Sequence, residues 1–210
     1  MDGKQIVKAG YNAIAARYVT TRDELSEDVQ LLDEIVQRLP RGAKILDAGC
    51  GAGVPVAKLL SQFFDVTGVD FAEKQIEMAR QLVPQARFLV QDMADLAFPE
   101  GSFDAVCSYY AIIHVPREEH RKILQGFCRV LKPSGLMLLC TGANDIEEDL
   151  AEDYLGAPMY WSHYDAPTNL RMIAESGFDV LLAKEVAEST HPSAKHLFVL
   201  AQKRPREDRA

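Results

Sequence analysis

A short glycine-rich segment, KILDAGCGAG, sets the strictest limit on how this chain can fold; it runs from Lys44 to Gly53. Ile45 and Leu46 begin an apolar run typical of a short buried strand, and a helical pattern with Pro55 in its first turn follows the glycines. A glycine turn between a strand and a helix brings bare backbone against a ligand and points helix N–H groups at it. The spacing is G-x-G-x-G, whereas dinucleotide folds use G-x-G-x-x-G, so it argues against a nicotinamide dehydrogenase.

An acidic residue closes the next apolar run. The segment FFDVTGVD places Asp70 at the C-terminal end of an expected strand, 17 residues after Gly53. An acid at this place in a strand–helix–strand unit can accept both hydroxyls of an adenosine ribose. The glycine turn and Asp70 together indicate a ligand that contains adenosine.

Three further segments follow these two in the order and spacing of one enzyme family: QDMADLAF (91–98), FDAVCSYYAIIHV (103–115) and LKPSGLMLL (131–139). DAGCGAG is similar to the family pattern E/D-x-G-x-G-x-G, and VTGVDFAEKQIEMAR is similar to the segment after it. Most of the chain thus resembles the class I S-adenosylmethionine-dependent methyltransferases. It is most similar to their small-molecule branch, of methyltransferase type 11/25, which includes quinone-biosynthesis enzymes. The resemblance implies S-adenosylmethionine as cofactor and S-adenosylhomocysteine as its product.

The chain is expected to form one methyltransferase domain, residues 1–202, followed by a charged tail, residues 203–210. A length of 210 residues with 48% hydrophobic content is enough to bury one core. The resemblance implies an α/β fold, a Rossmann-like doubly wound sheet of seven strands with the last strand antiparallel. Residues 1–40 are then a helical N-terminal cap, and residues 144–166 a small lid inserted after the fifth strand.

Hydrophobic periodicity predicts alternating helices and strands along the chain. Helices are expected over 3–20, 25–40, 54–64, 72–84, 117–133 and 166–178. Strands are expected at 44–47, 63–70, 86–92, the start of 102–116, 135–142, and in a closing hairpin over 178–186 and 195–203, with 188–194 as its loop.

Composition limits the partners. With 31 acidic residues against 23 Lys and Arg the net charge is −8, a poor match for phosphate backbones, so no nucleic acid is expected. No signal peptide or long apolar span is evident, so the protein is expected to be cytoplasmic, without a membrane, as a monomer or homodimer. The four cysteines, at 50, 107, 128 and 140, have no metal-ligand spacing; no metal is expected, and reduced thiols are the simplest interpretation.

The expected cofactor contacts lie at the strand ends. Gly49, Gly51 and Gly53 would let backbone approach the methionine portion, with Asp47 as a direct or indirect acceptor for its ammonium group. Asp70 would hold the ribose. The remaining expected cofactor contacts are Tyr11, Tyr18, Cys50, Phe71, Gln91, Asp92, Met93 and Tyr109.

Several of these contacts have a purely structural alternative. Asp92 can accept from the adenine amine, or it can cap the turn that follows. Phe71 and Met93 would cover the adenine faces, although a methionine at a loop edge also fills gaps in a core. Tyr11 and Tyr18 match the N-terminal aromatic segment that folds over the cofactor in the resembled family, or they are packing residues of a cap helix.

The acceptor site is expected among aromatic residues and histidines. Tyr110 and His114 follow the fourth strand, and ligands gather at the C-terminal ends of strands in open α/β sheets. The other expected acceptor contacts are Tyr160, Trp161, His163 and Tyr164. His114 and His163 are the candidate bases, although His114 could instead satisfy a backbone carbonyl.

The segment 144–166 can be interpreted in two ways. It holds the only Trp and three of the seven Tyr within 11 residues, which are costly to leave exposed and favour a lid over the active site. The alternative is an acidic, solvated helix followed by a separate apolar cluster.

The function implied is methyl transfer to a small-molecule acceptor. The cofactor carries the chemistry and the protein supplies alignment. Two alternatives remain: propylamine transfer on the same scaffold, for which the paired acids expected beside the fourth strand are missing, and a non-catalytic module that binds the cofactor. The acceptor and the atom that is methylated stay open.

Overall fold

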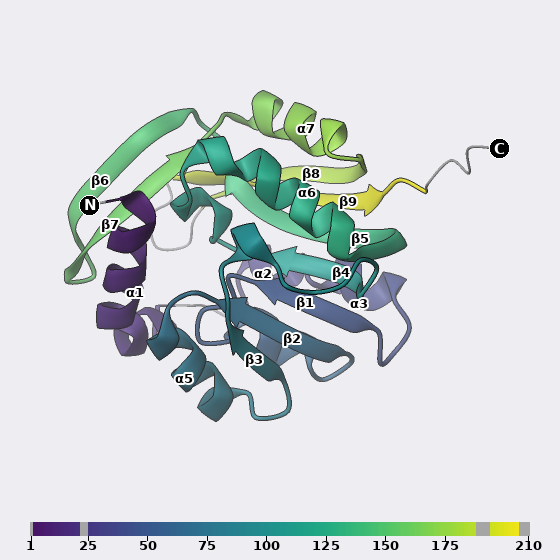
Figure 1. The fold of residues 1–210 in the computed structure, drawn as a ribbon, viewed down its shortest axis with the longest axis horizontal. Coiled ribbons are helices and arrows are strands. Elements are labelled where there is room, and N and C mark those ends of the chain that lie inside the picture. Colours follow the sequence, from purple (N-terminus) through teal and green to yellow (C-terminus); the bar gives the residue numbers. More distant parts are fainter. Residues whose placement is uncertain (1, 22–24, 188–193, 206–210) are drawn as a thin grey trace.

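The computed structural model describes residues 2–21, 25–187 and 194–205, and at its centre lies a seven-stranded sheet (Figure 1). Its strands are β1 (Lys44–Ala48), β2 (Asp65–Asp70), β3 (Arg87–Val90), β4 (Phe103–Ser108), β5 (Leu131–Gly142), β8 (Phe178–Ala187) and β9 (Lys195–Lys203). They follow the order β3-β2-β1-β4-β5-β9-β8. Strands β1 to β5 pair in parallel, and β9 runs antiparallel to both β5 and β8. The expected seven-stranded sheet with an antiparallel last strand is confirmed.

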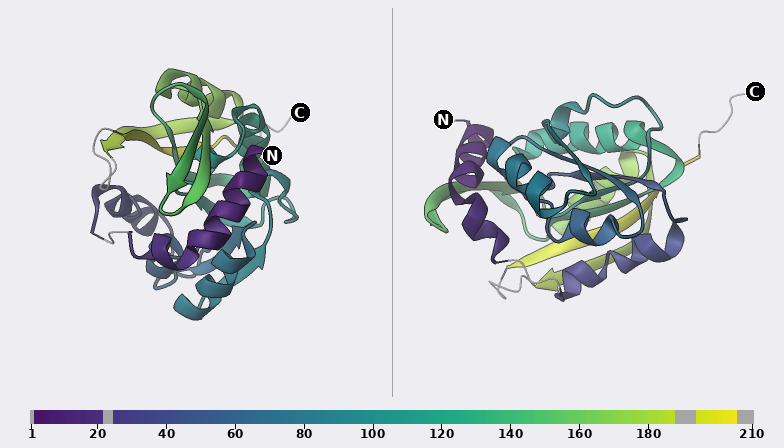
Figure 2. Two further views of the ribbon diagram at one scale, coloured as in Figure 1. Left: turned by 90° about the vertical axis from the view of Figure 1, so that its left-hand side faces the viewer. Right: turned by 90° about the horizontal axis from the view of Figure 1, so that it is seen from below.

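Helices cover both faces of this sheet (Figures 1 and 2). They are α1 (Gly3–Val19), α2 (Glu27–Gln30), α3 (Asp33–Arg38), α4 (Val56–Leu60), α5 (Glu73–Leu82), α6 (His120–Val130) and α7 (Ala166–Glu175). Three short 3₁₀ turns are η1 (Met93–Asp95), η2 (Ile112–His114) and η3 (Arg117–Glu119). In Figure 1, α5 and α6 lie in front of the sheet and α2 and α3 behind it. None of the helices in the described ranges is long and apolar enough to cross a membrane.

The main core lies between the sheet and its helices. Ile45 and Leu46 on β1 and Phe127 on α6 have no measurable exposure. This agrees with the apolar runs and the helical periodicity that predicted these elements. None of the four cysteines, all of them in the described residues, forms a disulfide; three are buried, and Cys128 on α6 is half-buried.

Residues 25–40 depart from the expected single helix, because they form α2 and α3. Leu31 and Leu32 stay in the helical region, but their N–H groups bond to Asp28 and Val29, three residues back. Such bonds tighten the turn to 3₁₀ geometry and interrupt the α-helix while the chain keeps its direction.

The segment after β5 forms a two-stranded β-hairpin of β6 (Ile146–Tyr154) and β7 (Ala157–His163). Its turn has positive φ angles at Leu155 (55°) and Gly156 (96°), as a two-residue hairpin turn requires. Arg17 on α1 donates a hydrogen bond to the Leu155 carbonyl. The hairpin tip is therefore tied to the first helix.

Helix α1 and the hairpin share a small hydrophobic cluster of their own, here called the cap cluster. Its buried members are Val7, Ile14, Ala157, Met159 and Tyr160. The two elements lie side by side (Figure 2), and they approach so closely that a Cβ on Gly10 would lie 2.6 Å from the Pro158 carbonyl oxygen. The β8–β9 loop at 188–193 and the last residues of the tail, 206–210, lie outside the described residues.

Candidate active site

Two adjoining cavities open where β1, β2 and β4 end. The first encloses about 540 Å³ and the second about 410 Å³ of empty space, each including its solvent-open mouth. Five residues line both cavities: Tyr18, Gly49, Gly51, Tyr109 and Tyr110. The first continues toward α1, α5 and η1, and the second toward the start of α4. Together they form one elongated site around the glycine turn.

The backbone of the glycine turn would be strained if a residue other than glycine occupied it. Gly49, Gly51 and Gly53 have φ angles of 75°, 52° and 78°, a region that L side chains rarely adopt. A Cβ on Gly49 would also lie 2.2 Å from the Ala111 Cβ. Gly49 and Gly51 line the cavities, whereas Gly53 packs under the turn against Phe88.

Asp47, at the end of β1, lies in the second cavity with a buried carboxyl group. Among the described residues its Oδ2 has no hydrogen-bond partner. Burial, together with the nearby Asp70, raises the pKa of Asp47 to about 8. The carboxyl is thus ready to accept a cationic donor, because such a group would satisfy Oδ2 and favour the charged form.

Asp70, at the end of β2, braces the turn. Its Oδ2 accepts from the Gly51 N–H and its Oδ1 from the Ala72 N–H, both at 2.9 Å. Burial raises the pKa of Asp70 to about 6, although these backbone bonds oppose the rise. Each carboxylate oxygen keeps further acceptor capacity toward the first cavity.

The third acid, Asp92, lies after β3 and accepts from the Ala94 N–H at 2.8 Å, so its capping role is present. It also pairs with Lys4 of α1 at 2.8 Å, and Lys4 pairs with Glu119 at the same distance. Burial lowers the pKa of Lys4, but the bonds to Asp92 and Glu119 outweigh it, so the pKa is raised and the ammonium stays charged. Sequence reasoning did not identify Lys4.

Gln75 on α5 is a second lining residue that sequence reasoning missed. Its side chain is 1% exposed and reaches the first cavity, where Nε2 lies 3.4 Å from the Tyr11 carbonyl oxygen. Its Oε1 has no partner among the described residues. No sequence pattern singles Gln75 out, because its burial depends on how α5 packs.

Three aromatic side chains and a methionine form walls of the two cavities. Phe71 and Met93 line the first cavity, and Tyr109 and Tyr110 line both cavities. The Tyr109 hydroxyl points away and donates to the Asp28 carbonyl, so this residue presents its ring. Tyr110 has a φ of 52°, unusual for a bulky residue, and strain of this kind often marks functional sites.

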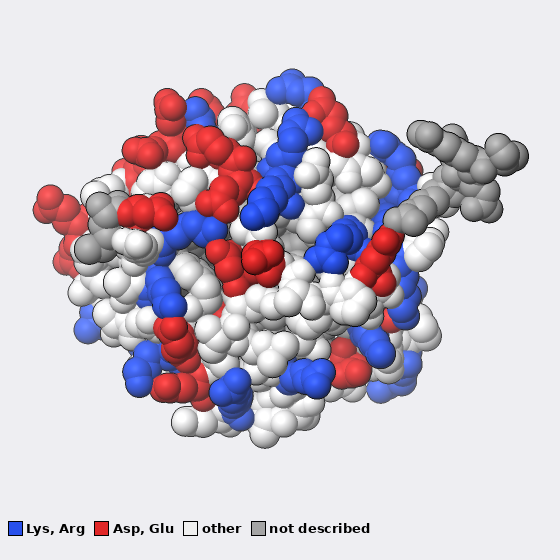
Figure 3. Space-filling model, viewed as in Figure 1, with Lys and Arg blue, Asp and Glu red and all other residues white. Residues whose placement is uncertain are grey.

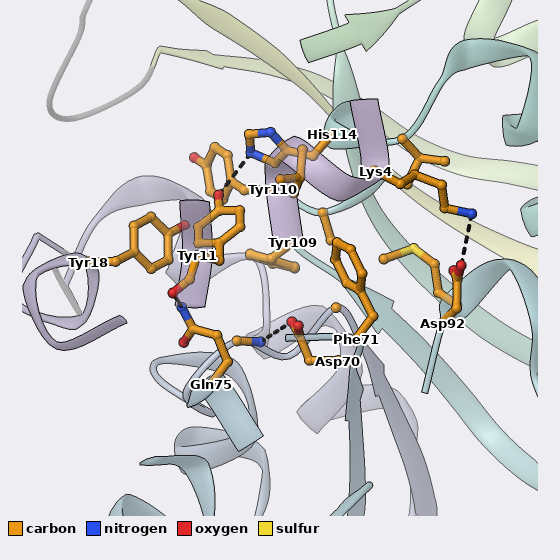
Figure 4. Close-up of a pocket in the computed structure, with 16 residues that line it drawn as sticks. Lys4, Tyr11, Tyr18, Asp70, Phe71, Gln75, Asp92, Tyr109, Tyr110 and His114 are labelled. Carbon is orange, nitrogen blue, oxygen red and sulfur yellow. Dashed lines mark hydrogen bonds and ion pairs between the residues drawn. The ribbon is translucent and has the colours of Figure 1, made fainter. Parts of the chain in front are cut away.

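Tyr11 and His114 meet across the first cavity (Figure 4). The Tyr11 hydroxyl lies 2.9 Å from His114 Nε2, and His114 Nδ1 lies 2.7 Å from the Tyr160 carbonyl oxygen on β7. His114 therefore does satisfy a backbone carbonyl, as one interpretation expected, and it also faces the cavity.

Of the other expected residues, Cys50 lines the second cavity. Gln91 and the four expected residues of the hairpin region, Tyr160, Trp161, His163 and Tyr164, line neither cavity. The Tyr160 ring packs near Gly3. The Trp161 ring lies 5.3 Å from the His114 ring and lines a different groove. His163 Nδ1 donates to the Asn144 carbonyl, and the Tyr164 ring stacks with the Arg117 guanidinium. Burial lowers the pKa of His163.

Comparison with known proteins agrees with this geometry. A family model described as a methyltransferase domain matches residues 45–135, which hold the glycine turn, Asp70 and Asp92. The chain is 32% identical over 135 residues to the 2-methyl-6-phytyl-1,4-hydroquinone methyltransferase of Synechocystis sp.. These matches confirm the resemblance to the class I S-adenosylmethionine-dependent methyltransferases.

Other members of this methyltransferase family are similar over more of the chain. The 27-O-demethylrifamycin SV methyltransferase of Amycolatopsis mediterranei is 29% identical over 78% of this chain and 65% of its own. The Synechocystis match covers 60% of this chain and 42% of that protein, so the chain spans less than two thirds of the curated relatives. The solved structure of a Methanosarcina mazei methyltransferase has the same fold, with a TM-score of 0.73 and 24% identity. The match covers 82% of this chain and 98% of that chain.

Proposed function

We propose that this protein transfers a methyl group from S-adenosylmethionine to a small-molecule acceptor. The observation that carries the proposal is the arrangement of three carboxylates, Asp47, Asp70 and Asp92, around a glycine turn with aromatic walls. S-adenosylmethionine offers three sets of donors, an ammonium group, ribose hydroxyls and an adenine amine, and the polar groups of the site are mostly acceptors.

The fit extends to the atoms without partners. The buried Asp47 Oδ2 suits the ammonium group, and the buried Gln75 Oε1 suits a ribose hydroxyl next to Asp70. Phe71 and Met93 would cover the adenine, and Asp92 would accept from its amine. When bound, the sulfonium supplies an electrophilic methyl group, and the residues of the chain hold and align the reactants.

The charge pattern also favours this ligand over nucleotides or nucleic acids. Among the described residues that line the two cavities, Lys4 is the only cation, and two carboxylates neutralise it. On the face drawn in Figure 3, Lys and Arg are interspersed with Asp and Glu, and acidic side chains gather on the side of the hairpin. The relatives named above act, by their names, on a hydroquinone and on a rifamycin, which supports a small-molecule acceptor.

Replacing Asp70 with Ala is expected to weaken binding of S-adenosylhomocysteine by about 1–3 kcal/mol, because ribose hydroxyls lose their acceptor in a largely closed site. Titration calorimetry measures the affinity, and NADH serves as a ligand that should not bind. Asp65→Ala, at the exposed start of β2, is the matched control and should bind normally.

Failure of the unaltered protein to bind S-adenosylhomocysteine would refute the proposal. Binding without release of S-adenosylhomocysteine from S-adenosylmethionine, in incubations with quinols and other small acceptors, would point instead to a module that only binds the cofactor.

A further inference from the structure

The hydrogen bonds of His114 define its protonation. A carbonyl oxygen has no proton to give, so His114 Nδ1 must donate to the Tyr160 carbonyl, 2.7 Å away. In the neutral ring the other nitrogen, Nε2, is then an acceptor, and it receives the Tyr11 hydroxyl at 2.9 Å. The backbone of the hairpin thus holds the imidazole with its basic nitrogen toward the first cavity.

The chain of hydrogen bonds continues beyond Tyr11. Tyr18 hydrogen-bonds the Tyr11 side chain, and the two rings meet edge to face at 5.1 Å. Burial, with Tyr18, Tyr154 and Asp70 nearby, holds the pKa of Tyr11 well above its usual range. A buried tyrosine of this kind stays protonated, and so it can pass a proton along without keeping a negative charge.

The acid strength of the groups selects the kind of acceptor. An acceptor oxygen must lose a proton when it is methylated, whereas a neutral amine already has a free electron pair. A phenol has the usual pKa of a tyrosine, about 10, and the pKa of Tyr11 is held above that value. A phenol proton therefore passes downhill to the Tyr11 oxygen as Tyr11 gives its own proton to His114. An aliphatic alcohol is a far weaker acid and would transfer its proton uphill.

Building on the methyl transfer proposed above, we propose that Tyr11 and His114 form a proton relay for an acceptor with a phenol-type hydroxyl. The acceptor oxygen forms its bond to the methyl carbon as the carbon–sulfur bond breaks and its electron pair stays on sulfur. The hydroxyl proton passes to the Tyr11 oxygen, and the Tyr11 proton passes to His114 Nε2. The imidazolium, held by the Tyr160 carbonyl, later releases this proton to solvent.

Nuclear magnetic resonance of the ¹⁵N-labelled, ligand-free protein tests the relay without any turnover. We expect the neutral His114 ring to carry its proton on Nδ1, and we expect Tyr11→Phe to shift the Nε2 resonance. His120→Gln, which alters a buried histidine on α6 outside both cavities, should leave the His114 signals in place. A proton on Nε2, or no response to Tyr11→Phe, would overturn the relay.

Kinetics tests the acceptor class, with catechol and 1,2-phenylenediamine as matched probes. We expect catechol to be methylated preferentially, and Tyr11→Phe and His114→Gln to lower kcat about 100-fold with KM little changed. Tyr164→Phe, on a residue that stacks with Arg117 outside both cavities, is the tyrosine control. Preference for the diamine, turnover of neither probe, or an unchanged kcat in both relay variants would overturn the proposal.

The two proposals fail differently. If S-adenosylhomocysteine does not bind the unaltered protein, the methyl-transfer function is wrong whatever the state of His114. If it binds and methyl transfer occurs, but the relay variants turn over normally with calorimetric affinity unchanged, only the relay is wrong.

Discussion

Replacing Gly49 with Ala is expected to abolish detectable binding of S-adenosylhomocysteine and to lower the free energy of unfolding by about 2–5 kcal/mol. Left-handed backbone costs an L residue about 1–2 kcal/mol, and overpacking a filled site costs about 1–3 kcal/mol more. The new Cβ would lie 2.2 Å from the Ala111 Cβ and 2.8 Å from the Met93 Cε, so the turn must move away from the segment between β4 and η2 and from η1. Urea unfolding and calorimetry measure the two effects.

Gly42 offers a closely matched control for this prediction. Its φ of 78° is nearly that of Gly49, 75°, but a Cβ there would meet nothing within 4 Å. Gly42→Ala should therefore cost only the backbone strain and leave binding intact. An equal loss of stability in both variants would mean that the contact with Ala111 is relieved without cost.

Replacing Asp47 with Asn is expected to move stability and binding in opposite directions. The pKa of Asp47 is raised from 3.8 to about 8, so between these values the folded state keeps a proton that the unfolded state releases. The wild-type protein therefore loses stability as pH rises from about 4 to 8, and this loss is absent below that window. The neutral Asn avoids this loss, so the ligand-free variant should unfold at higher urea concentration than the wild type at pH 8.

The same substitution should weaken binding of S-adenosylhomocysteine by about 1.5–3 kcal/mol, because the ammonium group loses a charged acceptor. Calorimetry at pH 7 in two buffers of different ionisation enthalpy adds a second measurement. The wild-type carboxyl should release close to one proton on binding, and Asp47→Asn should release none. Asp65→Asn is the control, and equal proton release in wild type and Asp47→Asn would contradict the role given to Asp47.

Local sequence was sufficient to predict the sheet and the residues at its C-terminal edge. Four of these residues lie at the ends of buried strands: Asp47 and Asp70 within the last two positions of β1 and β2, and Gly49 and Tyr109 directly after β1 and β4. Their place in the fold therefore follows from the strand order alone. Lys4 and Gln75 lie on amphipathic helices, where one polar residue has no distinguishing pattern. Their role depends on where the helices pack, which no local signal reveals.

The hairpin shows a second limit. Strand β6, IEEDLAEDY, is mostly exposed and lacks the alternation of apolar and polar residues that identifies a strand. In β7 the aromatic density was visible, but neighbouring residues point to opposite faces. The Tyr160 carbonyl reaches His114, while Trp161 and His163 line a different groove that also borders the start of β9. Composition cannot decide which face of such a strand turns inward.

The cap cluster also has a consequence for synthesis on the ribosome. Helix α1 emerges early, yet the surface on which Val7 and Ile14 pack is encoded by residues 157–160. At about 5–20 residues per second, roughly 7–30 s separate the completion of α1 from that of the hairpin. During that interval the apolar face of the first helix has no partner, while the parallel strands β1 to β5 are already synthesised. The wall that α1 gives to the first cavity is thus completed only when this helix docks onto a hairpin synthesised later.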